Sequence, residues 1–481
     1  MKKAARITTV FFIVGLICMP FLSCKTENLD ETENDENAGY SKTTKEQKPE
    51  LELPDVKYGG YEFRILNSPT VEMFADTTIV AEEETGESVN DAVHKRNRMV
   101  EERFDVKIVE ILTGRREISP KASNSIKSGA DDYDLFMLGL DEGVGIAQNK
   151  MVADYNIIPY LNLSQPWWDR DMAHDLSIGN QNYFVAGDFS LMHYGKTQGV
   201  FFNKQLLQDL GIESPYDIIA AGKWTFDKFH EMGKGASKDL DGDGAFTDKD
   251  QYGFVAYSWV YANAFVAGAG QQMITKDADG MHVFRVGEKY VEAYQKLMQI
   301  MHDGDMLLDG LDGQINPELI FLNNQSLFYS SNIHSAVGLR GMETDFGIIP
   351  LPKYDETQGS YHTYVYPPPA MLVPVTASDL GRTGVILEAL CYESTDTVVK
   401  AYYNDLLKTK ISRDDESEAM LDVIFENRIY SITDIYYMPE TYEQLYKFSR
   451  NQNANLMSWI EQHEGKITAA VEKNNQLFNE N

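Results

Sequence analysis

The stretch Asp134-Leu135-Phe136-Met137-Leu138-Gly139-Leu140 decides the fold. After its acidic first residue it is apolar without interruption, as is typical of a strand buried on both faces of a parallel sheet. The chain before it alternates between strand and helix patterns. Residues 61–66 alternate like a strand, 88–100 carry apolar residues at helical spacing, and 104–112 are apolar and β-branched. This alternation predicts an α/β fold.

The second half of the chain continues the alternation with longer helices. We predict helices after Thr225, over 288–302, over 382–407 and from Asp414 or Asp415, and strands over 254–257, 326–330 and 346–349. A chain of 481 residues is too long for one ordinary domain, so we expect two compact lobes. Small molecules bind open α/β sheets at the carboxyl ends of the strands. Loops that follow strands are therefore the first places to look for a site.

The first 54 residues predict export. Basic residues precede the apolar run 7–22, as in a signal peptide, which we place at 1–23. Phe21-Leu22-Ser23-Cys24 resembles a bacterial lipobox, so Cys24 is the expected lipidation site. Residues 24–54 are acidic and polar, which predicts a disordered tether. We expect an extracytoplasmic protein, lipid-anchored to the outer face of the bacterial cell membrane. Ordinary signal cleavage and an uncleaved anchor are the alternatives.

Charge and cysteine content exclude several classes of protein. The formal net charge of −31 argues against nucleic-acid binding, which needs a basic face. With only Cys18, Cys24 and Cys391 present, a disulfide framework is excluded, and Cys391 lies in an apolar stretch typical of a core. The sequence contains no HExxH, GxSxG or GxGxxG motif. A carboxylate pair for glycoside hydrolysis could still occur among the 74 acidic residues.

Residues 239–250 match a calcium-binding loop of the EF-hand type. Carboxylates at its first, third and fifth positions would converge on one hard cation, and Gly244 permits the tight turn. The expected metal ligands are Asp239, Asp241, Asp243, the carbonyl of Ala245, Thr247 and Asp250. Asp250 stands where the longer Glu is usual, which makes bidentate closure less assured. We predict a structural Ca²⁺ ion; the alternative is a solvated acidic turn.

Aromatic and polar residues near predicted strand ends are candidates for ligand binding. A sugar presents flat C–H faces and a rim of hydroxyl groups, so exposed rings beside Asp, Asn and Arg would suit it. Residues 257–263 and 166–169 are the stretches richest in such side chains, although most aromatic side chains in any protein lie in its core. The candidate ligand-binding residues are Trp259, Tyr257, Tyr261, Asn263, Trp167, Trp168, Asp141, Glu142, Asp188, Asn332, His334 and Tyr366.

Five short segments follow one another in a recognisable order. They are 133–135 (YDL), 199–204 (GVFFNK) with 210–212 (LGI), 224–229 (WTFDKF), 251–254 (QYGF) and 346–352 (FGIIPLP). In order and spacing across residues 55–430 they resemble the family 1 extracellular solute-binding proteins of bacterial ABC carbohydrate importers, the lipoproteins related to maltose-binding protein.

The resemblance implies a periplasmic-binding-protein-like fold of type II, with two α/β lobes, a multi-strand hinge and a ligand cleft between the lobes. On this basis we place lobe 1 at 55–195 and 364–410, and lobe 2 at 198–362 and 411–481. Chain crossings are expected near 194–200, 361–369 and 408–413.

The function that the resemblance implies is capture of an oligosaccharide by lobe closure and delivery to the permease subunits of an ABC importer. The protein would act as a monomer, would not be an enzyme, and would touch the membrane only through its N-terminal lipid. Other functions are compatible with the sequence: a surface glycan-processing hydrolase or lyase, a structural or adhesive surface protein, and a binding protein for a peptide or a polyamine.

Overall fold

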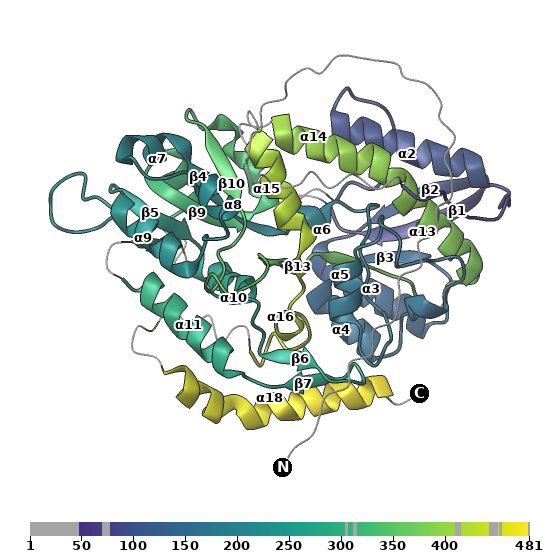
Figure 1. Cartoon of the computed structure of the whole chain (residues 1–481). Helices are drawn as coiled ribbons and strands as arrows, with labels where there is room; N and C mark the ends of the chain where they lie inside the picture. The colour runs from purple at the N-terminus through teal and green to yellow at the C-terminus, as the bar shows by residue number, and fades with distance from the viewer. Residues whose placement is uncertain are drawn as a thin grey trace, which may run out of the picture. The chain divides into compact units, whose positions relative to one another are not determined.

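The computed structural model describes residues 48–69, 77–303, 306–310, 315–408, 415–441, 451 and 455–479. These residues belong to one compact unit, Lys42–Asn481, which contains two main sheets (Figure 1). The predicted signal peptide, Cys24 and most of the predicted tether lie outside the described residues. The end of that segment contacts the folded body, because Lys48 Nζ donates to the carbonyl of Tyr392 at 2.6 Å.

The first sheet has the strand order β12-β3-β1-β2. Its strands β1 (Tyr61–Asn67), β2 (Val106–Leu112) and β3 (Leu135–Gly139) are parallel, and β12 (Pro369–Leu372) runs antiparallel to β3. β3 is the uninterrupted apolar strand, and Leu135, Phe136 and Leu138 are fully buried, as the sequence predicts. The helices that follow or cover these strands are α2 (Ser88–Phe104), α3 (Arg115–Lys127), α4 (Leu140–Gln148), α5 (Arg170–Leu176) and α13 (Leu380–Ser394).

The second sheet has the strand order β10-β4-β9-β5-β8. Its strands β5 (Tyr252–Ala256), β8 (Leu307–Asp309) and β9 (Ser326–Asn332) are parallel, whereas β4 (Gln198–Asn203) is antiparallel to β9 and to β10 (Phe346–Ile349). The associated helices are α7 (Lys204–Leu210), α8 (Pro215–Ala220), α9 (Phe226–Ala236), α10 (Ser258–Gly268), α11 (Glu288–Met301), α12 (Pro317–Leu322) and α15 (Asp415–Glu426).

Short elements connect and bridge the sheets. β11 (Thr363–Tyr364) pairs in parallel with β13 (Arg428–Ile429), and β6 (Ile274–Lys276) forms a hairpin with β7 (His282–Phe284). In the described part of the chain, the remaining helices are α6 (Met192–Gly195), α14 (Lys400–Lys408), α16 (Ile432–Tyr436) and α18 (Leu456–Asn479), with 3₁₀ segments at 155–157 and 333–341 and a π turn at 395–399. α18 packs on β7, α11 and α4 (Figure 1).

Helix boundaries follow local capping chemistry. Thr225 caps α9 as predicted, since its side chain accepts the amide of Lys228. At the start of α2, the side chain of the N-cap residue Glu87 accepts the amide of Asn90. Asp91 accepts the amides of residues 85 and 86 and so orders the preceding turn.

Among the described residues, the buried apolar side chains form three groups. One belongs to the first sheet with α2 and α13, and one mainly to the second sheet with α15. The third contains residues of both sheets, including Phe136 and Phe254. The two halves of the molecule are therefore in direct contact in this structure. Where one lobe ends and the other begins stays a prediction.

Candidate functional site

The carboxyl edges of both sheets lie against the same two connecting segments. At the first sheet, Gly139 at the end of β3 pairs with Pro369 at the start of β12. At the second sheet, Asn332 at the end of β9 pairs with Gln198 at the start of β4. The two segments are joined to each other, because the amide of Tyr366 donates to the carbonyl of Lys196 at 3.0 Å. Segments 196–198 and 363–369 thus link the two edges at which α/β sheets bind ligands.

Charged side chains gather where the first sheet meets these segments. Asp141 and Glu142 open α4 directly after β3, and Arg115 opens α3 after β2. The guanidinium of Arg115 lies 3.7 Å from the Asp141 carboxylate. Lys196 Nζ lies 5.7 Å from the centre of the Tyr366 ring. The sequence prediction included Asp141, Glu142 and Tyr366, and it missed Arg115 and Lys196. The signal for both missed residues is their position, one after a strand and one in a predicted crossing.

Burial controls the electrostatics of this charged group. Lys196 is only 9% exposed, and burial, together with the nearby Arg115, lowers the pKa of its amine to about 8. Burial and Asp141 raise the pKa of Glu142. Burial and Asp141 also raise the pKa of the Tyr366 phenol. The site therefore combines the largely buried ammonium of Lys196 and the half-buried carboxylate of Glu142 with the exposed guanidinium of Arg115 and carboxylate of Asp141.

Buried polar atoms without a hydrogen-bond partner in the described part of the chain occur along both carboxyl edges. They include Oε2 of Glu142, Oε1 of Gln198, Oγ of Ser258 after β5, Oγ of Ser330 in β9 and Oγ1 of Thr363. Buried polar groups are normally paired, and a ligand is one of the partners that can pair them. Hydroxyl groups, which donate and accept, would suit this mixture of carboxylate, amide and hydroxyl atoms.

The second sheet contributes further predicted residues to these edges. Tyr257 precedes α10 and is half-buried, and Asn332 and His334 are half-buried at the end of β9. Asn263 Nδ2 donates to the Asp434 carboxylate at 3.1 Å, and the Tyr364 hydroxyl donates to the same carboxylate at 2.9 Å. Trp259 lies in α10, but its side chain is outside the described part of the structure.

Solved structures that match this chain include sugar-binding and ABC substrate-binding proteins. A sugar-binding protein MalE from Xanthomonas citri matches with a TM-score of 0.64 at 12% identity, over 87% of this chain and 100% of that chain. An ABC substrate-binding protein from Listeria monocytogenes in complex with cycloalternan matches with a TM-score of 0.53 at 13% identity, over 87% and 98%. A sugar transporter protein from Rhizobium etli in an open conformation matches with a TM-score of 0.58 at 11% identity, over 86% and 99%. The chain has the solute-binding-protein fold.

The sequence itself gives no closer assignment. No protein-family model matches it, and a search of the curated proteins finds no match. The α/β solute-binding-protein fold expected from the five sequence segments is confirmed by the solved structures. Those neighbours are binding proteins rather than enzymes.

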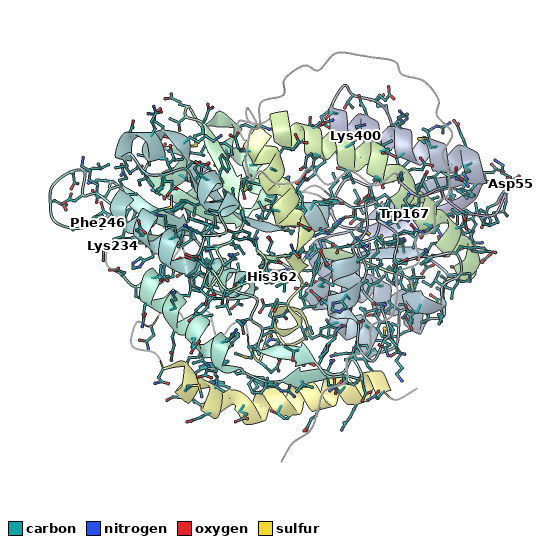
Figure 2. The ribbon with its side chains drawn as sticks, viewed as in Figure 1. Asp55, Trp167, Lys234, Phe246, His362 and Lys400 are labelled. Atoms are coloured by element: carbon teal, nitrogen blue, oxygen red, sulfur yellow. The ribbon has the colours of Figure 1, made fainter. Side chains whose placement is uncertain are left out.

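Two tryptophans that were predicted to bind ligand lie instead in the hydrophobic core beside the first sheet. Trp167 and Trp168 are 1% and 3% exposed, and Figure 2 labels Trp167 among the elements of the first sheet. Their indole N–H groups both donate to the Glu388 carboxylate, at 3.0 and 2.8 Å. The prediction that these rings line a cleft is corrected, because their apolar faces and their polar N–H groups are both satisfied inside the protein.

Tyr261 and Asp188 are also buried. Tyr261 packs in the core, with its ring centre 5.8 Å from that of Phe254. Asp188 accepts hydrogen bonds from the hydroxyls of Tyr194 and Thr395, at 2.8 and 2.7 Å. Burial raises the pKa of Asp188 to about 7. These two residues are corrections as well, since both have their partners inside the protein.

A buried ion pair joins β13 to the first half of the molecule. Arg428 Nη2 lies 3.1 Å from the carboxylate of Asp169, which also accepts the hydroxyl of Tyr430. The amide of Tyr430 donates to Asp175 at 3.0 Å, so carboxylates of α5 and its N-cap hold this connecting strand. The predicted third crossing at 408–413 lies almost entirely outside the described residues. β13 is the strand that the structure places beside β11.

A pocket of about 380 Å³ separates the β6–β7 hairpin from the loop after α5. Lys276 of the hairpin reaches across it, donating to the Ser177 hydroxyl at 2.7 Å and to the carbonyl of His174. The amide of Gly179 donates to the carbonyl of Gly280 at 3.1 Å. These hydrogen bonds thus join the β6–β7 hairpin to the loop after α5, in the half of the molecule that contains the first sheet.

The acidic loop after α9 has the donor set expected for a cation. One ligand atom from each of Asp239, Asp241 and Asp243 lies within 4.8 Å of the others. The two oxygens of Asp250 accept the amides of Leu240 and Thr247, both at 2.8 Å, and the two oxygens of Asp239 likewise accept the amides of Gly242 and Gly244. The bonds to Asp250 lower its pKa, with the bond from Thr247 the largest cause.

The base of the acidic loop is fixed by packing. The Phe246 ring lies 5.7 Å from the Tyr252 ring in an edge-to-face contact. Figure 2 labels Phe246 beside this loop. Three converging carboxylates on a fixed loop fit a calcium ion chemically.

Proposed function

We propose that this protein is the extracellular solute-binding component of an ABC importer, and that it captures an oligosaccharide and releases it unchanged. The observation that carries the proposal is the meeting of two carboxyl edges at segments 196–198 and 363–369. A ligand placed there contacts both halves of the molecule. Solved neighbours with the same fold include a protein in complex with cycloalternan and one in complex with acarbose.

The chemistry of the edges favours a sugar over a peptide or a polyamine. Unpaired buried groups include hydroxyl, amide and carboxylate atoms, which pair readily with a rim of hydroxyls. Rings of Tyr366 and Tyr257 stand beside them, half-buried, and can lie against C–H faces.

Capture would work by a shift between an open and a closed population. A ligand that contacts both edges binds the closed state better and moves the equilibrium toward it by its difference in affinity. We infer that the permease recognises the closed conformation of the protein, and that no bond of the ligand is broken. In this proposal the carboxylates of Asp141 and Glu142 bind ligand hydroxyls and do not act as an acid and base pair.

A panel of oligosaccharides in a thermal-shift assay tests the proposed function. A true ligand raises Tm through binding to the folded state, and the same glycan, recovered after incubation, should have its original chain length by mass spectrometry. Shortened products would contradict the capture function and would indicate a glycan-processing enzyme instead. An unchanged Tm with every glycan would contradict sugar binding altogether.

We propose attachment to the outer face of the membrane through a lipid on Cys24. Among the described residues, no helix has both the length and the apolarity that a membrane span needs. Labelling with a fatty-acid analogue in cells should modify the wild type and leave a Cys24→Ser variant unmodified. Labelling of both chains, or of neither, would contradict lipidation at Cys24.

We propose a structural calcium ion held by Asp239, Asp241 and Asp243, with the carbonyl of Ala245, Thr247 and Asp250 completing the set. The convergence of three carboxylates supports the proposal. A chelator should lower the Tm of the wild type, and calcium should restore it. Asp241→Asn should weaken this response, whereas Asp279→Asn, in an unrelated turn, should keep it. Identical melting with chelator and with excess calcium would contradict the proposal.

A further inference from the structure

The helices α11 and α18 pack against each other at the lower edge of the molecule in Figure 1, and a groove lies between them. Its volume of about 690 Å³ falls within the range of about 300–1,000 Å³ that is typical of binding pockets. The groove shares no lining residue with segments 196–198 and 363–369 or with the ends of β3 and β9. It is therefore a surface separate from the candidate site.

The floor of the groove is apolar. Val291 of α11 and both Met457 and Ile460 of α18 line it, together with Phe284 and Val286 before α11. Ile460 is 7% exposed and Met457 is 45% exposed, so an apolar surface extends from the core to the solvent. A methionine that lines such a groove can adapt its shape to the side chains of a partner.

Acidic side chains form the rim of this floor on both sides. They are the exposed residues Glu288 and Glu292 of α11 and Glu461 and Glu464 of α18. Among the described residues, Arg285 is the one cation that lines the groove, and none of the four carboxylates has an ion-pair partner. Lys296 of α11 pairs instead with Asp227, at 2.7 Å. The rim is therefore negative and is not neutralised by the chain itself.

The spacing of the lining residues places them on one stripe of each helix. The stripe of α18 consists of residues 457, 460, 461 and 464, and that of α11 of residues 288, 291 and 292. These are the spacings i, i+3, i+4 and i+7 that bring side chains to the same side of a helix. Two such stripes with an apolar floor form the kind of groove in which an amphipathic helix binds.

We propose that this groove binds a basic amphipathic helix of a partner protein. The apolar side of that helix would lie on Met457 and Val291, and its lysine or arginine side chains would pair with the glutamates on both rims. The same rims repel an acidic helix and a membrane surface rich in anionic lipid. A net charge of −31 likewise opposes the approach of a second copy of this chain.

Fluorescence anisotropy of a labelled model peptide tests the proposal. The peptide has about 18 residues, or about five helical turns, with leucine along one side and lysine along the other. A peptide of the same composition in scrambled order and a peptide with glutamate in place of lysine are the comparisons. The basic amphipathic peptide should bind saturably at one site and about tenfold or more tightly than the scrambled one, because only the ordered peptide places all its leucines on the floor.

Substitutions in the groove should weaken this binding. Met457→Asp places a charge on the floor, and the double variant Glu461→Lys with Glu464→Lys reverses one rim; each should lower the affinity about tenfold. The control is Glu472→Lys, which reverses an exposed charge of α18 outside the groove and should bind as the wild type does. All these side chains are exposed, so the variants should keep the Tm of the wild type.

Hydrogen exchange of the wild type locates the peptide without any substitution. Binding should protect residues 284–292 and 457–464. Protection elsewhere, equal binding of the scrambled peptide, or an equal loss of affinity in Glu472→Lys would show unspecific adhesion to an acidic surface and would overturn the proposal. Binding of the acidic peptide or of phosphatidylglycerol vesicles in place of the basic peptide would overturn it as well, as would the absence of any binding.

Discussion

Burial decides whether a residue of this protein belongs to the core or to the candidate site. The type of residue alone does not reveal its burial. The positions of Asp141, Glu142 and Tyr366 could be predicted, because each lies where a strand or a crossing ends, and their contact with a ligand stays a prediction. Trp167 and Trp168 have the composition of a sugar site, yet both donate to Glu388 inside the core. That partner is 220 residues or more away in sequence, and no local pattern indicates such a contact. Lys196 was missed for the opposite reason, because a lone lysine carries no motif.

Glu388→Ala should destabilise the protein. It leaves two buried indole N–H groups and the amide of Asn162 without their acceptor, which costs about 2–4 kcal/mol in the free energy of unfolding. Urea unfolding followed by tryptophan fluorescence measures the change. Glu292→Ala, on the exposed face of α11, should change the free energy by little. Equal effects of the two variants would contradict this role of Glu388.

Asp188 should make stability depend on pH. Burial raises its folded pKa to about 7 from the ordinary 3.8, so the folded state holds a proton that the unfolded state releases between these values. The stability contribution of Asp188 is complete below about pH 4 and is lost as the pH rises through 7. Asp188→Asn should therefore gain stability relative to the wild type between pH 5 and pH 8 in urea titrations. A difference that is constant with pH, or that follows the exposed control Asp209→Asn, would rule this out.

At the scale of elements, long periodic segments were predictable and short pairings were not. The predicted strand 346–349 is β10, and the predicted helix from 288 is α11. β11 and β13 have two residues each, which is too short for a periodic pattern, and the two strands lie far apart in the sequence. The hairpin β6–β7 is equally short. These small elements nevertheless hold the connecting segments and the contact between the halves.

The hairpin contact should depend on Lys276. Lys276→Met removes the bonds to Ser177 and His174, so the amide of Gly179, which donates to Gly280, should exchange its hydrogen faster. Native-state hydrogen exchange of the peptides covering 174–180 and 274–284 measures this. Lys289→Met, at the exposed start of α11, serves as the matched control. Unaltered exchange in Lys276→Met would show that the hairpin is held by other contacts.

At the scale of the whole molecule, the order of five sequence segments predicted the fold, and solved structures at 11–13% identity confirm it. The relation between the halves could not be predicted, because it rests on contacts between distant residues. Gln148 of α4 donates to Asn474 of α18 at 2.8 Å, while Asn475 pairs with the backbone of His282 in β7. An opening motion has to break or stretch such contacts, so opening and ligand release should be coupled.

Hydrogen exchange with and without a bound oligosaccharide tests most directly the claim that both carboxyl edges hold the ligand. A glycan that raises Tm should protect peptides covering 140–146 of the first sheet, 196–200 and 363–369 of the connecting segments, and 257–263 of the second sheet. Protection restricted to one sheet, or confined to the groove of about 690 Å³ between α11 and α18, would contradict the claim.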